Sequence, residues 1–252
     1  MTWTLRLLAL ALILLLVAPT VVLAGNEIHS IPFPADYDLL TEGASSYENS
    51  GDHFDSPYFV HPDFYNMTST DTLTILTHFD TYQQTTEWSC GPVAALMALH
   101  YLGNDDYTEL QIAEMAEGLR APTAPHDLVR MLKTIGWYYE TSPRGDGLPD
   151  APTFQHDADF TEWVIKNLSE GTPVMVDWID WGGHWQVIIG YDTMGTESFG
   201  DDVLIVADPY DTSDHYQDGY MIYGAERFFY MWHSYDGMDI QPWVIGKPAR
   251  SE

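Results

Sequence analysis

The chain contains 252 residues, of which 38 are Asp or Glu and 9 are Lys or Arg, giving a formal net charge of −29. Hydrophobic residues make up 45% and aromatic residues 14%, which excludes a disordered acidic tail and fits one folded domain with an extension. The charge argues against nucleic acid or an anionic membrane as a partner, because phosphate groups repel such a surface. Cys90 is the only cysteine, so an intrachain disulfide and a zinc site with several cysteine ligands are excluded.

The first 24 residues have the pattern of a secretory signal peptide. Arg6 is the only charged residue before Glu27, an apolar run follows at 7–18, and small residues end the segment at Ala24. Twelve apolar residues are too few for a membrane span of about 20, although the stretch counted on to Ala24 could form an uncleaved anchor. We expect a secreted, extracellular protein without stable membrane insertion after cleavage, or one held at the membrane if the segment stays.

The charge of the mature chain allows two interpretations. Removal of residues 1–24 would leave 8 basic and 38 acidic residues, or 8 − 38 = −30 charges over 228 residues. One interpretation is an acidic secreted protein that its charge keeps soluble. The other is adaptation to high salt, in which dissolved ions screen the self-repulsion over a few ångströms. The composition leaves both open.

Residues 25–72 are polar and interrupted by prolines, so we expect an extended arm before a domain at 73–245. In that domain helical periodicity comes first and strand-like runs follow. This order predicts an α+β fold with an antiparallel sheet. The expected elements are a β-like segment at 73–79, helices at 90–102, 108–117, 126–135 and 159–168, a loop at 142–157, strands at 173–178, 184–191, 203–207 and 220–223, and a short helix at 225–232.

Cys90 lies at the predicted start of the helix at 90–102. Pro92 suits the first turn of a helix, and apolar residues on most faces predict that this helix is buried. The partial positive charge at a helix N-terminus stabilises a thiolate, and Gly91 would let the backbone approach a substrate closely. A lone cysteine is more often a small buried hydrophobic residue, so a catalytic role for Cys90 also requires a suitable base.

His184 is the candidate base, because it opens an apolar strand directly after two glycines. Considered alone, such a histidine is more often structural. Antiparallel pairing with the strand at 203–207 would bring Tyr191 near Val203 and His184 near Asp208. A carboxylate at that end of the sheet can hold the imidazole in one tautomer.

The assignment of the carboxylate leaves alternatives. Asp208 alone would fit a turn-forming Asp-Pro pair, which is common. Asp177 is a nearer competitor along the chain, whereas Asp192 lies at the opposite end of the strand. The pairing argument therefore favours Asp208 as the residue that orients His184.

Gln84 precedes Cys90 by six residues. Its side-chain amide could donate a hydrogen bond to a developing oxyanion, together with the backbone N–H of Cys90. A glutamine considered alone is more often a surface residue, and the adjacent Gln83 is an alternative one position away. Gln84 is thus a candidate oxyanion donor whose assignment depends on the rest of the site.

The order Gln84, Cys90, His184, Asp208 resembles that of papain-like cysteine peptidases. The local sequences resemble one branch, the bacteriocin-processing, double-glycine-leader peptidase-like family (cysteine peptidase family thirty-nine), over about residues 73 to 232. The resemblance implies a papain-like fold, cleavage through a thioester and no metal or other cofactor. It implies Cys90 as nucleophile, His184 as base, Asp208 as orienting residue and Gln84 at the oxyanion hole. The sequences concerned are Ser-Cys-Gly-Pro-Val-Ala-Ala at 89–95, Gly-His-Trp at 183–185, Gly-Tyr-Asp at 190–192 and Ala-Asp-Pro-Tyr at 207–210.

These residues predict a secreted thiol peptidase that hydrolyses peptide bonds in a peptide or protein substrate. Two alternatives share the same fold. An acyl transferase would pass the acyl group from Cys90 to an amine instead of water, and the acylation step would be identical. A binding domain could also have kept the fold without catalysis.

Four aspartates follow the strand at 203–207. Carboxylates are ligands that calcium prefers, but the spacing does not follow that of an EF-hand loop. The sequence therefore favours a solvated acidic loop over a calcium site. The residues are Asp208, Asp211, Asp214 and Asp218.

Overall fold

The computed structural model describes residues 43–44, 56–116, 122–212, 214–234 and 239–249. The predicted signal peptide at 1–24 and much of the predicted arm at 25–72 lie outside these residues. The described part of the arm at 56–72 contains turns but neither helix nor strand. It packs against the domain through the buried Phe64, whose ring centroid lies 5.7 Å from that of Tyr220. No helix within the described part of the chain is long and apolar enough to cross a membrane.

An antiparallel sheet of seven strands forms the centre of the domain. The strands are β1 (Leu73–Ile75), β2 (Tyr138–Thr141), β3 (Val174–Trp178), β4 (His184–Asp192), β5 (Val203–Ala207), β6 (Tyr220–Gly224) and β7 (Trp243–Lys247). Their order is β2-β7-β3-β4-β5-β6, and β1 pairs with the second half of β4, beyond the end of β3. All residues of β3 and nearly all of β4 are buried, so these two strands form the middle of the core.

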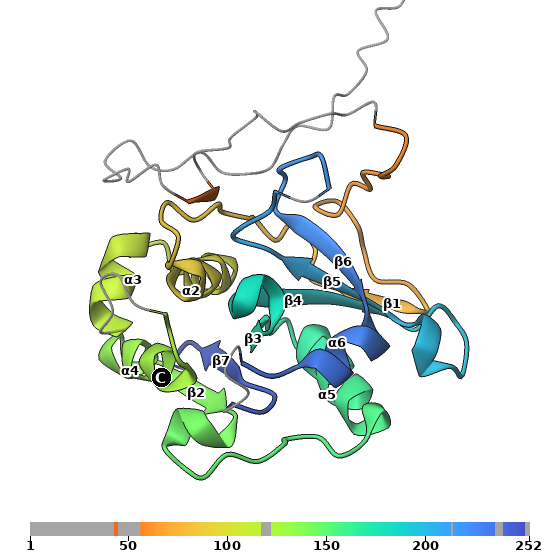
Figure 1. The fold of residues 1–252 in the computed structure, drawn as a ribbon. Helices are drawn as coiled ribbons and strands as arrows, with labels where there is room; N and C mark the ends of the chain where they lie inside the picture. Colours follow the sequence, from red (N-terminus) through yellow and green to blue (C-terminus); the bar gives the residue numbers. More distant parts are fainter. Residues whose placement is uncertain (1–42, 45–55, 117–121, 213, 235–238, 250–252) are drawn as a thin grey trace, which may run out of the picture.

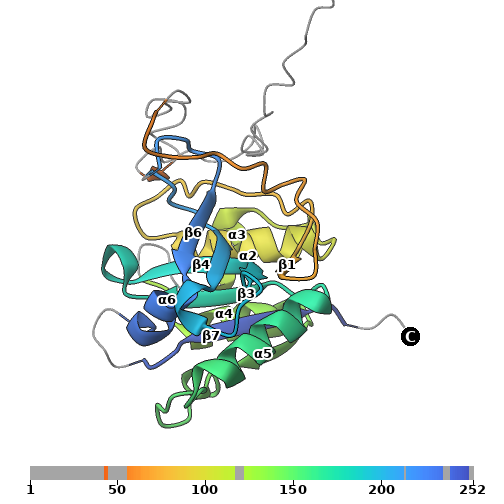
Figure 2. The same cartoon turned by 90° about the vertical axis from the view of Figure 1, so that its right-hand side faces the viewer.

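Helices cover both faces of this sheet. They are α2 (Cys90–Tyr101), α3 (Glu109–Ala116), α4 (Pro125–Thr134), α5 (Asp157–Ser169) and α6 (Ala225–Met231). Helices α2, α3 and α4 lie on one side of the sheet, and α5 and α6 lie on the other (Figure 1). In the turned view α5 passes in front of the sheet while α2 and α3 lie behind it (Figure 2). Coverage of both faces explains why the central strands are apolar at successive positions instead of alternating with polar residues.

The predicted α+β class with an antiparallel sheet is confirmed, and the expected helices begin and end within two residues of the observed bounds. Strands β2 and β7 were not expected. β2 has only four residues, none of them fully buried, so it carries little hydrophobic signal. β7 lies between β2 and β3 and ends two residues beyond the predicted domain boundary at 245. The expected loop at 142–157 contains a short 3₁₀-helix, Pro143–Asp146.

Helix α2 passes through the core, as its composition predicts. Every residue from position 91 to 99 is buried. A helix that is apolar on all sides is stable only when it is enclosed by other elements, and α2 lies between the sheet and the helices α3 and α4 (Figure 1). Because the following turns of α2 are buried, the position of Cys90, the first residue of this helix, is fixed.

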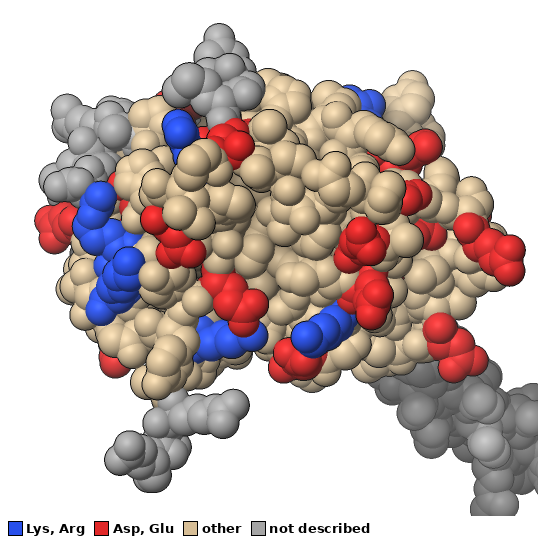
Figure 3. Space-filling model, turned by 90° about the horizontal axis from the view of Figure 1, so that it is seen from below, with Lys and Arg blue, Asp and Glu red and all other residues tan. Residues whose placement is uncertain are grey.

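The described surface carries many more acidic than basic side chains. Figure 3 shows acidic groups distributed over one face, with a few basic groups at separate places among them. Several of the basic side chains are already paired: Arg130 with Asp127 at 3.1 Å, Arg144 with Asp239 at 2.6 Å and Lys247 with Glu140 at 2.7 Å. Most acidic groups must then be balanced by ions from solution.

We expect the folded protein to become more stable as salt is added. Raising sodium chloride from about 0.01 M to about 1 M shortens the Debye length from about 30 Å to about 3 Å, so repulsion between distant carboxylates is screened. The melting temperature over this range measures the effect, and sodium chloride is preferable because sulfate would also strengthen apolar burial. A flat or falling curve would contradict the interpretation as adaptation to high salt.

Candidate active site

Cys90 is the first residue of α2 and is partly exposed. The N–H groups in the first turn of a helix have no partner within the helix, so their partial positive charge is directed at the thiol. Gly91 has a packing role here, because a Cβ at this position would lie 2.6 Å from the Cβ of Thr123. A substrate was expected to approach the backbone closely at Gly91. In the structure the segment at 122–124 makes this close approach instead, and it forms a wall of the site.

His184 is placed by a tight turn between β3 and β4. Three successive residues of that turn have positive φ angles: Trp181 at 51°, Gly182 at 83° and Gly183 at 113°. Glycine adopts such angles without strain, which explains the pair of glycines directly before the histidine. The turn makes His184 the first residue of β4, paired with Trp178, and leaves its side chain buried.

The structure joins His184 to Asp208. The Nε2 atom of His184 lies 2.6 Å from Oδ1 of Asp208, which directly follows β5. The two residues meet at one end of the sheet, as the antiparallel pairing predicts. The predicted register holds at this end of the sheet, where Val187 faces Ala207. It differs by one residue at the far end, where Tyr191 faces Leu204, because the ladder shifts in a bulge after Ile188.

The Cys90 thiol interacts with the same imidazole. Because Nε2 of His184 is bonded to Asp208, the ring atom available to the sulfur is Nδ1. Burial alone would lower the pKa of His184, but the Asp208 carboxylate and, to a smaller extent, Cys90 outweigh it, and the pKa is raised well above its ordinary value. His184 therefore stays in the imidazolium form to higher pH than an isolated histidine does. A positively charged imidazolium can stabilise a thiolate beside it.

Asp208 is itself held by two further donors. Its Oδ2 accepts a hydrogen bond of 2.7 Å from Nε2 of Gln186, and its Oδ1 accepts one of 2.7 Å from the backbone N–H of Tyr210. The Oε1 atom of Gln186 in turn accepts a 2.8 Å bond from Nε1 of Trp178. These bonds fix the carboxylate orientation toward His184.

Gln186 was not among the predicted site residues. The sequence signal was a polar residue within the apolar run at 184–191. The structure shows that Gln186 is fully buried there. It lies two residues after His184, and residues two apart in a strand project from the same face. A glutamine at this spacing can reach whatever carboxylate the histidine reaches.

Gln84 and Gln83 differ in their surroundings. Gln84 is buried, and its Nε2 donates a 2.7 Å hydrogen bond to the carbonyl oxygen of Thr86, which leaves its second N–H for another acceptor. Gln83 is bonded at both ends of its amide, donating to the carbonyl of Asp208 at 3.0 Å and accepting from the N–H of Asp211 at 3.0 Å. This difference favours Gln84 as the candidate oxyanion donor, although its side chain is not part of the cavity wall beside the thiol.

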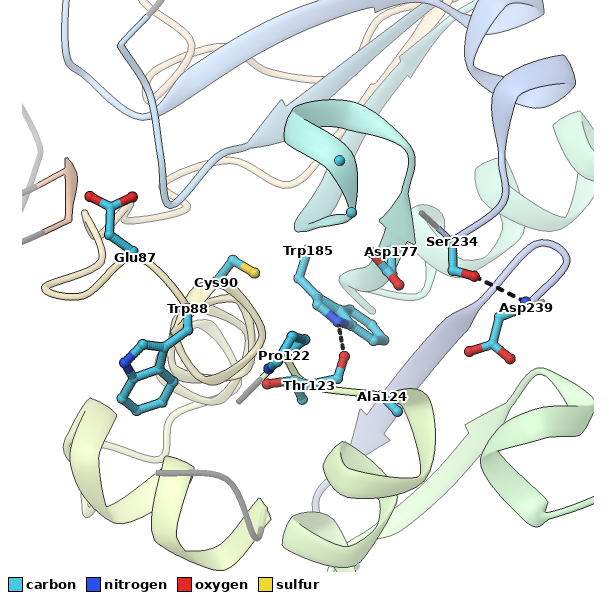
Figure 4. A pocket seen from close by; sticks show the side chains of 12 residues that line it. Glu87, Trp88, Cys90, Pro122, Thr123, Ala124, Asp177, Trp185, Ser234 and Asp239 are labelled. Carbon is cyan, nitrogen blue, oxygen red and sulfur yellow. Dashed lines mark hydrogen bonds between the residues drawn. The ribbon is translucent and has the colours of Figure 1, made fainter. Parts of the chain in front are cut away.

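A cavity of about 370 Å³ opens beside Cys90. In Figure 4 the sulfur of Cys90 points toward the side of the cavity that Trp185 lines, with Asp177 and Ser234 further along it. The indole Nε1 of Trp185 donates a 2.7 Å hydrogen bond to the carbonyl of Thr123 and so ties β4 to the segment at 122–124. A hollow of this size can enclose part of a peptide.

A helix that presents a cysteine at its N-terminus to a histidine–aspartate pair on an antiparallel sheet defines the class of papain-like cysteine peptidases. The chain belongs to the Peptidase_C39 like family, whose profile matches residues 76–239. The predicted resemblance to this branch of the class is therefore confirmed.

Among solved structures, the chain is similar to the peptidase domain of Streptococcus ComA, described as a bi-functional ABC transporter involved in a quorum sensing pathway. The two are 17% identical, the comparison covers 68% of this chain and 100% of that domain, and the TM-score is 0.45. No curated protein matches the chain.

Proposed function

We propose that this protein is a secreted cysteine peptidase that hydrolyses peptide bonds through a thioester. Cys90 is the nucleophile, His184 the base and Asp208 the residue that orients it, with Gln84 as an oxyanion donor. The observation that carries the proposal is the 2.6 Å bond between Nε2 of His184 and Oδ1 of Asp208, together with the electrostatic interaction of that imidazole with the Cys90 thiol at the start of α2. The apolar run at 7–18 supports export.

The arrangement can perform the reaction in two steps. The thiol proton of Cys90 passes to Nδ1 of His184, and the thiolate sulfur attacks the carbonyl carbon of the scissile bond. Negative charge then develops on the carbonyl oxygen, where the backbone N–H of Cys90 and the amide of Gln84 can donate to it. His184 returns the proton to the leaving amine as the C–N bond breaks, and a thioester with Cys90 remains.

Water completes the cycle in the second step. His184 takes a proton from the water, whose oxygen attacks the thioester carbonyl, and the C–S bond breaks as the thiolate leaves. Asp208 keeps Nε2 protonated throughout, so that Nδ1 is the atom that exchanges the proton.

Alkylation kinetics and product analysis test the proposal. At about pH 6, where an ordinary thiol is almost entirely protonated, Cys90 should react with iodoacetamide at least about 100-fold faster than a small-molecule thiol. Equal rates would instead indicate a binding domain that has kept the fold. Incubation of the protein with a peptide and an added amine then separates two reactions: hydrolysis gives a free carboxylate, whereas an acyl transferase would give the new amide.

We predict that replacing Gln186 with leucine slows hydrolysis without changing the overall fold. The variant loses the bond to Oδ2 of Asp208, and a hydrogen bond to a charged group contributes about 1.5–3 kcal/mol, which corresponds to about 10- to 100-fold in kcat/KM. Without this donor the Asp208 carboxylate interacts more strongly with the imidazolium of His184, so the pKa of His184 and the alkaline limit of the pH profile should move to higher pH. An unchanged profile in a folded variant would show that Gln186 has only a structural role.

A further inference from the structure

Three aspartates in the loop between β5 and β6 form a compact cluster. Asp211, Asp214 and Asp218 each place a carboxylate oxygen within 4.8 Å of the others. The four aspartates of this loop, including Asp208, were expected to be solvated. This expectation is wrong for three of them, since Asp208 is 1% exposed, Asp211 0% and Asp218 8%. Buried like charges this close repel one another strongly unless something neutralises them.

Asp211 gives the second, independent indication of a ligand. Its Oδ2 accepts a 2.8 Å hydrogen bond from the backbone N–H of Gly219, but its Oδ1 is buried and has no hydrogen-bond donor among the described residues. A fully buried carboxylate oxygen without a donor needs either a proton or a cation.

The charged groups around the three aspartates do not supply the positive charge that the buried Asp211 carboxylate needs. His61 and His215 interact with the charge of Asp214. Both histidines act on the half-buried Asp214, whereas the charges that act on the fully buried Asp211 are those of other aspartates. Within the described chain, the charges that act on Asp211, the deepest carboxylate, are thus all negative.

We propose that Asp211, Asp214 and Asp218 bind one calcium ion. All three offer carboxylate oxygens, which are hard ligands, and no cysteine or histidine atom belongs to the group within the described chain. Calcium accepts six to eight oxygens in flexible geometry at about 2.3–2.6 Å, so backbone carbonyls and water can complete the shell. Magnesium demands a nearly ideal octahedron and gives up its water reluctantly, which a site on a loop serves less well.

The ion would hold the loop that begins at Asp208. The N–H of Asp208 donates to the carbonyl of Gly219 at 2.8 Å, and the N–H of Asp211 donates to Oε1 of Gln83 at 3.0 Å. Gln83 in turn bonds the carbonyl of Asp208, so the loop and the segment before Gln84 form one connected unit. Binding of the ion does not depend on the proposed peptidase activity.

Equilibrium binding of calcium to the purified, chelator-treated protein tests the proposal. Sodium chloride at about 1 M limits charge interactions to about 3 Å and so suppresses general attraction of cations to the acidic surface. We expect one calcium ion per chain to bind saturably. At about 100 times the dissociation constant, calcium should raise the melting temperature by about 5 to 10 °C over the chelated protein. Magnesium at the same concentration should give a much smaller shift.

Matched variants complete the test. Asp211→Asn should abolish the saturable binding and the shift in melting temperature, and the partly exposed Asp214→Asn provides a milder replacement if Asp211→Asn fails to fold. Asp106→Asn removes the same charge from an exposed position outside the cluster and should change neither. The proposal is overturned if calcium does not bind saturably, if binding survives in both cluster variants, or if Asp106→Asn reduces it equally.

Discussion

Replacing Cys90 with alanine is expected to abolish peptide hydrolysis while leaving the fold intact. The sulfur forms the bond to the acyl group, and the chain has no second cysteine to replace it. We expect kcat to fall by about 10⁵-fold or more, the size of loss seen when a nucleophile is removed from a unit of this kind. Because Cys90 is partly exposed, loss of one sulfur atom should cost little packing. A peptide-cleavage assay and the melting temperature measure the two effects.

Ser198→Ala provides a control of equal size. It also removes a single heavy atom, from the cap of the short 3₁₀-helix Phe199–Asp201, which lies outside the cavity beside Cys90. This variant should keep full activity. Peptidase activity that survives in Cys90→Ala would rule out the thioester mechanism, whatever the control shows.

Much of the site was predictable because its residues lie next to local signals. Pro92 and the apolar run behind it mark the start of α2 and therefore the position of Cys90. The paired glycines mark the turn before His184. The loop between β4 and β5 is short, which favours antiparallel pairing of these two strands and so places Asp208 near His184. Local propensity and strand pairing thus determine which residues meet.

The remainder depends on contacts between distant segments. The bulge after Ile188 shifts the register of β4 against β5 by one residue. Gly190 in the middle of the strand is a sign of a bulge, but a glycine alone does not determine which way the register shifts. β7 lies between β2 and β3, a position that follows from tertiary pairing and not from its own five residues. The burial of Asp211 likewise results from packing of its loop onto Gln83, which lies 128 positions earlier in the chain. Pairings between segments far apart in the chain produce no periodic pattern of residue types that a single sequence would show.

Replacing His184 with alanine should cost nearly as much activity as the loss of Cys90. Base and nucleophile act as one unit, so a double variant of Cys90 and His184 should be no less active than either single variant. The fold should survive, because the buried Asp208 keeps its bonds from Gln186 and from the N–H of Tyr210. Additive losses in the double variant, measured with the same peptide substrate, would show that His184 acts independently of the sulfur.

Asp208→Asn should reduce activity less than His184→Ala and should also change its pH dependence. The carboxylate is the main group that raises the pKa of His184, so the neutral amide lets that pKa fall. His184 then loses its proton at lower pH, and the alkaline limb of the kcat/KM profile should move toward acid. Asp202→Asn is the matched control, because Asp202 is also buried and bonds Tyr191 at the other end of β5. The role of Asp208 is refuted if its variant keeps the original alkaline limb, or if the control shifts the limb equally.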